Sequence, residues 1–228
     1  MTDILIHGIN GRMGKEMYCA ALATQKVNVV CGVDKHALGD FNCPVYPSLA
    51  EVNCHVDAII DFSSPSALDG LLGFARNYGC ALVLATTGYG EEQVQKIREC
   101  AKLVPICLTA NTSLGICAFK RAITAVKDCL SDFDVSLTEL HRRGKKDAPS
   151  GTALMLKSAL SRNVQIHPIR CGDEIGTHEL TFYGNGESFT IRHTVSSRRV
   201  FALGAIEACI KTARLPPSLY AADGEILP

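Results

Sequence analysis

One fifteen-residue segment, 139–153, carries the side chains best suited to chemistry. It reads ELHRRGKKDAPSGTA and places a histidine and several cations directly ahead of a Pro-Ser-Gly-Thr helix start. The first N–H groups of a helix have no partner within it, and the helix dipole adds positive charge there, so anions bind readily. The segment therefore predicts an acid-base site for a carboxylated substrate, built from His141, the cations and the helix start at Ser150, Gly151 and Thr152.

Other interpretations of this segment stay open. Four of the five residues 142–146 are Arg or Lys, as in a solvated charge run or a nucleic-acid patch. Lys plus Arg and Asp plus Glu both number 23, and no aromatic residues are interleaved, so we expect no nucleic-acid partner. Residues 149–152 could also simply begin a helix, with Pro149 in the first turn and Ser150 or Asp147 as cap. Capping and ligand binding are compatible, because a cap uses only some of the N–H groups.

A glycine-rich loop follows the first apolar run of the chain. It comprises Gly8, Ile9, Asn10, Gly11, Arg12, Met13 and Gly14, between an expected strand over 3–7 and an expected helix over 13–24. Glycines in this context let the backbone approach a pyrophosphate, and Asp34 ends the next strand, where an acid can bond a ribose hydroxyl. The loop therefore predicts dinucleotide binding, and the alternative is an ordinary glycine turn.

The residues at the end of the second strand do not choose between NADH and NADPH. Asp34 favours a free ribose, whereas the adjacent Lys35 can meet a 2′-phosphate or be a solvated surface lysine. An exposed ion pair contributes only about 0–1 kcal/mol, less than the roughly 1.4 kcal/mol needed for a tenfold preference. Use of either cofactor, or of both, is the expectation.

Small polar residues end three later apolar runs. Ligands of doubly wound folds lie beyond the carboxyl ends of the strands, so these residues could face a nicotinamide ring. The alternative is plain turn chemistry, which favours the same residue types. The segments concerned are Asp61-Phe62-Ser63, Ala85-Thr86-Thr87-Gly88 and Ala110-Asn111-Thr112.

Apolar strands alternate with helices over the first half of the chain, which predicts a Rossmann-like doubly wound parallel sheet. We expect strands over 3–7, 27–33, 58–62, 81–85 and 104–108, with helices over 66–77 and 91–101. After one long helix expected over 113–130, period-two alternation over 134–140, 179–183 and 188–195 predicts a smaller α+β domain with a mixed sheet. The expected domains are 1–112, which holds the dinucleotide loop, and 113–200, with 201–228, helical over 201–215, returning to the first.

The composition indicates a soluble globule of one large or two small domains. The chain has 228 residues, 47% of them hydrophobic and 20% charged, with no apolar run of membrane-spanning length and no signal-peptide pattern at its start. Eleven cysteines without metal-ligand spacing are expected to be reduced thiols of a cytoplasmic protein, with no metal site. Six of them lie in apolar surroundings and are expected in the core: Cys19, Cys31, Cys80, Cys107, Cys117 and Cys209.

Taken together, these motifs resemble the 4-hydroxy-tetrahydrodipicolinate reductases, also called dihydrodipicolinate reductases, of lysine and diaminopimelate biosynthesis. The resemblance covers nearly the whole chain and includes the 8–14 loop, the three strand ends, the 139–153 segment, and the segments 172–178 and 196–198. The DAPSGTA run after a histidine and a lysine is its most specific part.

The resemblance implies NADH or NADPH reducing a cyclic dicarboxylate. It also implies a two-domain enzyme that is usually a homotetramer, with 113–200 as the domain that binds substrate and joins the subunits through its sheet. By motif, it implies that His141 is a proton donor and acceptor, that Lys145 is a second proton donor, and that Gly151 and Thr152 hold a substrate carboxylate. The implied cofactor contacts are Gly8 to Met13, Asp34, Ala85, Thr86, Thr87, Thr109, Ala110, Asn111 and Thr112.

The chain departs from the family at two of these positions. Arg142 stands where the family commonly has a second histidine that contacts substrate, and an arginine could replace it as a carboxylate partner. Ala85 stands where glycine is usual. The rival functions are another nicotinamide-dependent dehydrogenase, acting on an amino acid or imine, and a dinucleotide-binding sensor without catalysis.

Overall fold

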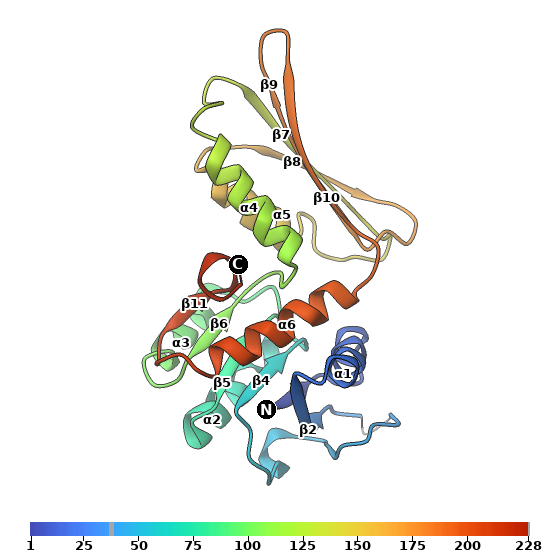
Figure 1. Ribbon diagram of the computed structural model, residues 1–228, viewed down its shortest axis with the longest axis vertical. Helices are drawn as coiled ribbons and strands as arrows, with labels where there is room; N and C mark the ends of the chain where they lie inside the picture. The colour runs from blue at the N-terminus through green and yellow to red at the C-terminus, as the bar shows by residue number, and fades with distance from the viewer. Residues whose placement is uncertain (37–38, 228) are drawn as a thin grey trace. The chain divides into compact units, whose positions relative to one another are not determined.

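Two separate sheets organise the chain in the computed structural model, which describes residues 1–36 and 39–227 (Figure 1). The first sheet belongs to a unit made of residues 1–112 together with the chain from Arg199 on. The second belongs to a unit made of residues 113–198. Each unit has its own set of helices and strands.

The first unit is a parallel sheet of seven strands, and it confirms the doubly wound fold. All its strand pairs are parallel, and the order reverses at the neighbouring strands β1 and β4, which is where such folds bind ligands. In sheet order the strands are β11 (Leu219–Ala221), β6 (Ile106–Leu108), β5 (Ala81–Leu84), β4 (Ala58–Asp61), β1 (Thr2–His7), β2 (Val27–Val33) and β3 (Val45–Tyr46).

Helices cover both faces of this sheet. Helices α1 (Arg12–Thr24) and α6 (Arg199–Thr212) pack against each other on one face, and α2 (Leu68–Tyr78) and α3 (Glu91–Cys100) lie on the other. The central strands are apolar on both sides, and Ile4, Leu5 and Ile6 are fully buried, as a doubly covered sheet requires. Three short helical turns complete the unit: η1 (Leu49–Glu51), η2 (Pro65–Ala67) and the π-helical turn η3 (Ala222–Ile226).

The second unit is a mixed four-stranded sheet covered on one face by two helices. Its order is β10 (Ser188–Val195), β9 (Gly176–Tyr183), β7 (Asp134–His141) and β8 (Gln165–Arg170), with only β7 and β8 parallel. Helices α4 (Leu114–Val126) and α5 (Gly151–Leu160) bury one face around Leu137, Leu180 and Phe182. The strand alternation leaves the opposite face without a helix.

Several expectations about this architecture were wrong in detail. The helix expected to run to Leu130 ends at Val126, and residues 127–130 continue it only as turns, in which the Lys127 N–H donates to the Ile123 carbonyl at 2.9 Å and the Leu130 N–H to the Val126 carbonyl at 3.1 Å. Pro149 is not in the first turn of α5, because the cap is Ser150. Cys19 is exposed: it lies between inward-facing neighbours on α1 and itself points outward.

Three strands had no counterpart among the expected elements. β8 contains Pro168, and a strand with proline is confined to a sheet edge, which is where β8 lies. β3 and β11 are two and three residues long and lie at the two edges of the seven-stranded sheet. No helix among the described residues is both long and apolar enough to cross a membrane.

Candidate active site

The glycine loop after β1 is shaped for close approach of a ligand to its backbone. Gly8 has a positive φ of 79°, and a Cβ on Gly14 would lie 2.2 Å from the Gly8 carbonyl oxygen, so a side chain at Gly14 is excluded. Helix α1 begins at Arg12 without a side-chain cap and without an acidic residue in its first turn. Its N-terminus therefore keeps the positive potential and donors that suit a pyrophosphate.

Asp34 accepts backbone hydrogen bonds from this loop and from the residue after Lys35. One of its carboxylate oxygens accepts the backbone N–H of Asn10 at 3.0 Å, and the other accepts that of His36 at 3.2 Å. Asn10 leaves its own Oδ1 buried without a hydrogen-bond partner. Ile9 is fully buried, its side chain packed against Gly32, so only its backbone is available to a ligand. These observations fit a dinucleotide cradle with Asp34 at its rim.

The buried carboxylate of Asp61, in one of the three strand-end segments, joins the ends of β1, β4 and β5. Asp61 is fully buried, and it accepts hydrogen bonds from Ser63 Oγ and Thr86 Oγ1, both at 2.6 Å, while His7 Nδ1 lies 2.8 Å away. Burial alone would raise the pKa of Asp61, but the hydrogen bonds from His7, Ser63 and Thr86 lower it. The carboxylate stays ionised and holds Thr86 in place.

The other expected cofactor residues divide between open and structural positions. Thr87 is exposed, and Ala85, Ala110 and Asn111 are half-buried around the strand ends. Thr109 is buried, and its hydroxyl donates to the Asn111 carbonyl at 2.6 Å. Thr112 donates to the Phe201 carbonyl at 2.7 Å, so its hydroxyl holds α6. Other expected contacts lie at the surface, namely Gly11, Arg12 and Lys35, while Met13 is half-buried.

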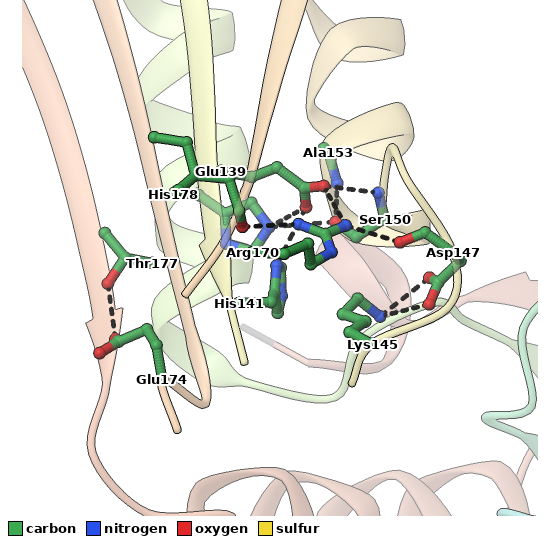
Figure 2. Close-up of polar contacts among 11 residues, drawn as sticks. Glu139, His141, Lys145, Asp147, Ser150, Ala153, Arg170, Glu174, Thr177 and His178 are labelled. Atoms are coloured by element: carbon green, nitrogen blue, oxygen red, sulfur yellow. Dashed lines mark hydrogen bonds and ion pairs between the residues drawn. The ribbon is translucent and has the colours of Figure 1, made fainter. Parts of the chain in front are cut away.

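The predicted acid-base residues come together at one end of the second sheet (Figure 2). His141 is the last residue of β7, and the residue is only 8% exposed. The loop that follows carries Lys145, whose ammonium donates to both carboxylate oxygens of Asp147 at 2.8 Å. The sheet end therefore presents an imidazole and an ammonium beside the start of α5.

The start of α5 is an anion site that already faces a carboxylate. Ser150 caps the helix by accepting the Ala153 N–H at 3.2 Å, which leaves earlier N–H groups of the first turn to other acceptors. Burial would raise the pKa of Asp147, but the ion pair with Lys145 and backbone N–H groups, that of Gly151 included, lower it. A carboxylate is thus stabilised at the position where the sequence predicts a substrate carboxylate.

Three residues without a predicted role, Glu139, Arg170 and His178, complete this cluster. Glu139 is fully buried, and its Oε1 accepts the Ser150 N–H at 3.0 Å and Arg170 Nη2 at 2.8 Å. Burial would raise the pKa of Glu139, but the nearby His141 ring and the hydrogen bonds from Ser150 and Arg170 hold it well below the usual range. Glu139 lies two residues before His141 on β7, and residues two apart on a strand lie on the same face. This two-residue period was the sequence signal that could have identified Glu139.

His178 lies on β9 opposite Glu139 and is neutral. Its ring is 5.2 Å from that of His141, edge to face, and its Nε2 is 3.4 Å from Ser150 Oγ. Burial and the proximity of His141 lower the pKa of His178 to about 3. The spacing along the chain gave no sign of this pairing, because it depends on the register of β7 and β9.

Glu139, His141 and His178 could also hold a metal ion by residue type and distance. One ligand atom from each lies within 4.8 Å of the others, and this is the one such group found among the described residues. The sequence predicted no metal site, because the three residues come from two strands and show no ligand spacing along the chain. Arg170 competes with a cation for Glu139, since its guanidinium already neutralises that carboxylate.

Arg142 lies in the loop with its backbone fixed. Its N–H donates to the Glu174 carbonyl at 2.7 Å, and its carbonyl accepts the Lys145 N–H at 3.1 Å. A Cβ on Gly144 would lie 2.8 Å from Arg142 Nη1, so the guanidinium extends over that glycine. The side chain is half-buried and stays on the loop that carries Lys145.

Comparisons with known proteins match both units. Sequence profiles described as "Dihydrodipicolinate reductase, N-terminus" and "Dihydrodipicolinate reductase, C-terminus" match residues 2–112 and 115–224. A 4-hydroxy-tetrahydrodipicolinate reductase of Clostridium novyi is 34% identical, over 99% of this chain and 98% of that protein. One from Caldanaerobacter subterraneus is 36% identical over 96% of each. A solved structure, the dipicolinate-bound dihydrodipicolinate reductase from Paenisporosarcina sp. TG-14, has a TM-score of 0.80 over 97% of both chains at 21% identity, which is a likeness of fold.

Proposed function

The chain belongs to the dihydrodipicolinate reductase family, and from this premise we propose that it reduces 4-hydroxy-tetrahydrodipicolinate to tetrahydrodipicolinate in lysine and diaminopimelate biosynthesis. The enzymes of this family are NAD(P)H-dependent oxidoreductases that act on a small dicarboxylate. The observation that carries the proposal is the convergence of His141, Lys145 and the start of α5 at one sheet end.

We assign cofactor binding to the first unit. Its glycine loop, the uncapped start of α1 and Asp34 fit a dinucleotide, and when bound, NAD(P)H supplies the hydride. The proposed contacts are Gly8, Ile9, Asn10, Gly11, Arg12, Met13, Asp34, Lys35, Ala85, Thr86, Thr87, Thr109, Ala110, Asn111 and Thr112. Of these, Ile9 contributes through its backbone, and Thr112 shapes the site by fixing α6.

We assign substrate binding and proton transfer to the second unit. Ser150, Gly151 and Thr152 would hold one substrate carboxylate at the start of α5, in the place that Asp147 now neutralises. Arg142 would bind the second carboxylate, as the chain's replacement for a family histidine. His141 or Lys145 would donate the proton that accompanies hydride addition to the conjugated C=C–C=N system.

We also propose that the chain forms a homotetramer through the open face of its second sheet. That face lacks a covering helix and exposes Ile169 and Tyr183, and its threonines bond to one another, Thr181 to Thr190 at 3.0 Å and Thr177 to Thr194 at 3.1 Å. Bare sheet faces of this kind are usually covered by another sheet. We place the enzyme in the cytoplasm, since its eleven cysteines, all among the described residues, form no disulfide.

The function is tested by following the absorbance of NADH and NADPH with enzymatically generated hydroxytetrahydrodipicolinate. Oxidation with this substrate, and none with a panel of amino acids and imines, would establish the proposed reaction. Oxidation with a panel member alone would replace it with the rival dehydrogenase. Tight NADH binding without oxidation of any substrate would indicate the non-catalytic sensor.

A further inference from the structure

Among the buried polar atoms of the second unit that lack a hydrogen-bond partner, two face each other. They are Oε2 of Glu139 and Nδ1 of His141, which are 3.2 Å apart in an ion-pair contact that falls outside hydrogen-bond geometry. Leaving a buried donor or acceptor unsatisfied costs about 1–3 kcal/mol, so each atom's favourable partner is the other. A small rotation of the ring completes the bond, provided that the proton of the neutral imidazole is on Nδ1.

The two oxygens of Glu139 have separate partners. Oε1 is occupied by two donors, the Ser150 N–H and Arg170 Nη2 (Figure 2). Arg170 Nη2 also donates to the Asp147 carbonyl at 2.6 Å, so the same guanidinium reaches the loop of Lys145. Oε2 is 3.8 Å from His178 Nε2, beyond hydrogen-bond distance, and 3.2 Å from His141 Nδ1.

The ring edge of His141 opposite Glu139 lies beside a residue without a side chain. A Cβ on Gly176 would be 3.1 Å from His141 Nε2 and 3.4 Å from Cδ2. Because residue 176 is a glycine, β9 places no side chain against Nε2 of His141 at this point. The His141 ring therefore faces Glu139 at Nδ1 and has open space beside Nε2.

We propose that Glu139 is a positioning residue that keeps a proton on Nδ1 of His141, so that the proton exchanged with substrate enters and leaves at Nε2. Arg170 and the Ser150 N–H keep Glu139 charged and aimed, although it is fully buried. The imidazolium gives its Nε2 proton to the substrate as hydride arrives and returns to the neutral Nδ1–H form. This inference rests on the proposed function for its catalytic consequence, but the tautomer is a property of the free protein.

The variant Glu139→Gln replaces the oxygen acceptor that faces His141 Nδ1 with an NH₂ donor, in a side chain of nearly the same size and shape. The donors Ser150 N–H and Arg170 fix the amide oxygen of the glutamine at the Oε1 position, so its NH₂ group must face His141 Nδ1. Nδ1 then accepts a hydrogen bond, and the neutral ring carries its proton on Nε2. The wrong tautomer in a similar carboxylate–histidine pair lowers turnover by about 10⁴-fold, and we expect a loss of at least roughly 10²-fold here.

The experiment measures imidazole tautomers by two-bond ¹H–¹⁵N NMR on the full-length chain at about pH 8.5, with His141→Gln used to assign the resonances. We expect Nδ1–H for His141 in the wild type and Nε2–H in Glu139→Gln, with kcat reduced and the KM for substrate and the Kd for NADH changed less than about threefold. The matched control is Glu187→Gln, on the exposed connection between β9 and β10, which should match the wild type in both measurements.

An Nε2–H tautomer in the wild type would overturn the proposal, even if Glu139→Gln does not fold. An unchanged kcat in a folded Glu139→Gln variant would overturn it as well. A wild type that shows the expected tautomer but oxidises no NADH with hydroxytetrahydrodipicolinate would refute the proposed reaction and leave the role of Glu139 in orienting His141 supported.

Discussion

At the scale of single residues, the proposed chemistry depends on how charges are neutralised at the end of β7. Lys145 forms an ion pair with the Asp147 carboxylate, and Glu139 forms one with Arg170. Arg170 also donates to the Asp147 carbonyl, so both ion pairs help to hold the loop of 142–149. A substrate carboxylate arriving at α5 competes with Asp147 for the same partners. The proposed proton donors are thus already placed before substrate binds.

Lys145→Ala should lower turnover by roughly 10²-fold or more, because it removes a proposed proton donor. The Kd for NADH should change little, since the glycine loop and Asp34 belong to the first unit. Single-turnover kinetics and fluorescence titration with NADH measure the two quantities. Equal losses in turnover and NADH binding would contradict the assigned role.

The buried His178 predicts a pH dependence of stability. Its pKa falls from 6.5 to about 3 on folding, so below pH 6.5 the unfolded chain binds a proton that the folded chain does not. The free energy of unfolding should therefore fall as pH is lowered from about 6.5, by roughly 1 kcal/mol per pH unit. Glu139, whose pKa is lowered on folding, reduces the free energy of unfolding only below about pH 4.5. The contribution of His178 can therefore be measured above that pH.

The comparison that isolates this effect is His178→Asn, measured by urea denaturation at several pH values between 6.5 and 4.5. The variant should be less stable at pH 7, because it leaves packing and the contact with Ser150 incomplete, yet its stability should depend less on pH. Equal pH slopes in the two proteins would show that His178 is not the group responsible.

At the scale of elements, one close contact fixes α6 to the segment that leaves β6. A Cβ on Gly204 would lie 1.7 Å from the Thr112 carbonyl oxygen, so Gly204→Ala should lower the free energy of unfolding by about 2–3 kcal/mol. Gly73→Ala is the matched control, because a Cβ there meets nothing within 4 Å in the middle of α2. In the same denaturation experiment, the free energy of unfolding of the Gly73→Ala variant should rise by about 0.5–1 kcal/mol. Similar effects at both positions would contradict the packing described here.

Elements with strong local signals could be predicted from the sequence. Continuous apolar runs located β1, β2, β4 and β5, and alternation located β7 and β10. β8 was missed because Pro168 interrupts its pattern, and its pairing with β7 supplies what the local sequence lacks. The end of α4 was placed at Leu130 rather than at Val126, because residues 127–130 form turns that keep some helix-like hydrogen bonds.

The candidate site divides in the same way. The motif within the single segment 139–153 was enough to group His141, Lys145 and the start of α5. Arg170 and His178 reach Glu139 from other strands, so their part depends on sheet order and register, which no local pattern encodes. The sequence could thus predict the groups that face the substrate better than the groups that support them.

At the scale of the whole molecule, the proposed reaction needs both units, since the cofactor residues belong to one and the proton donors to the other. The open face of the second sheet exposes Tyr183 and Ile169, and we expect it to bind another copy of the chain. The proposed assembly face and the proposed site lie on opposite sides of the same sheet: Thr181 and Thr177 face one way, and Glu139 and His178 face the other.

Thr181→Lys should dissociate the proposed tetramer, since it places a charge in the middle of this face beside Thr190. Light scattering coupled to size-exclusion chromatography should show a mass of about four chains for the wild type and a smaller mass for the variant. Ser158→Lys adds the same charge at an exposed position of α5 and should leave the mass unchanged. A monomeric wild type would refute the tetramer outright.

The most direct test of the central claim compares the wild type with His141→Gln in the oxidation of NADH and NADPH by hydroxytetrahydrodipicolinate. We predict oxidation by the wild type and a collapse of turnover, by roughly 10²-fold or more, in a variant that still binds NADH. The ratio of the two wild-type rates also gives the cofactor preference. Undiminished oxidation in His141→Gln would contradict the assignment of this sheet end as the acid-base site.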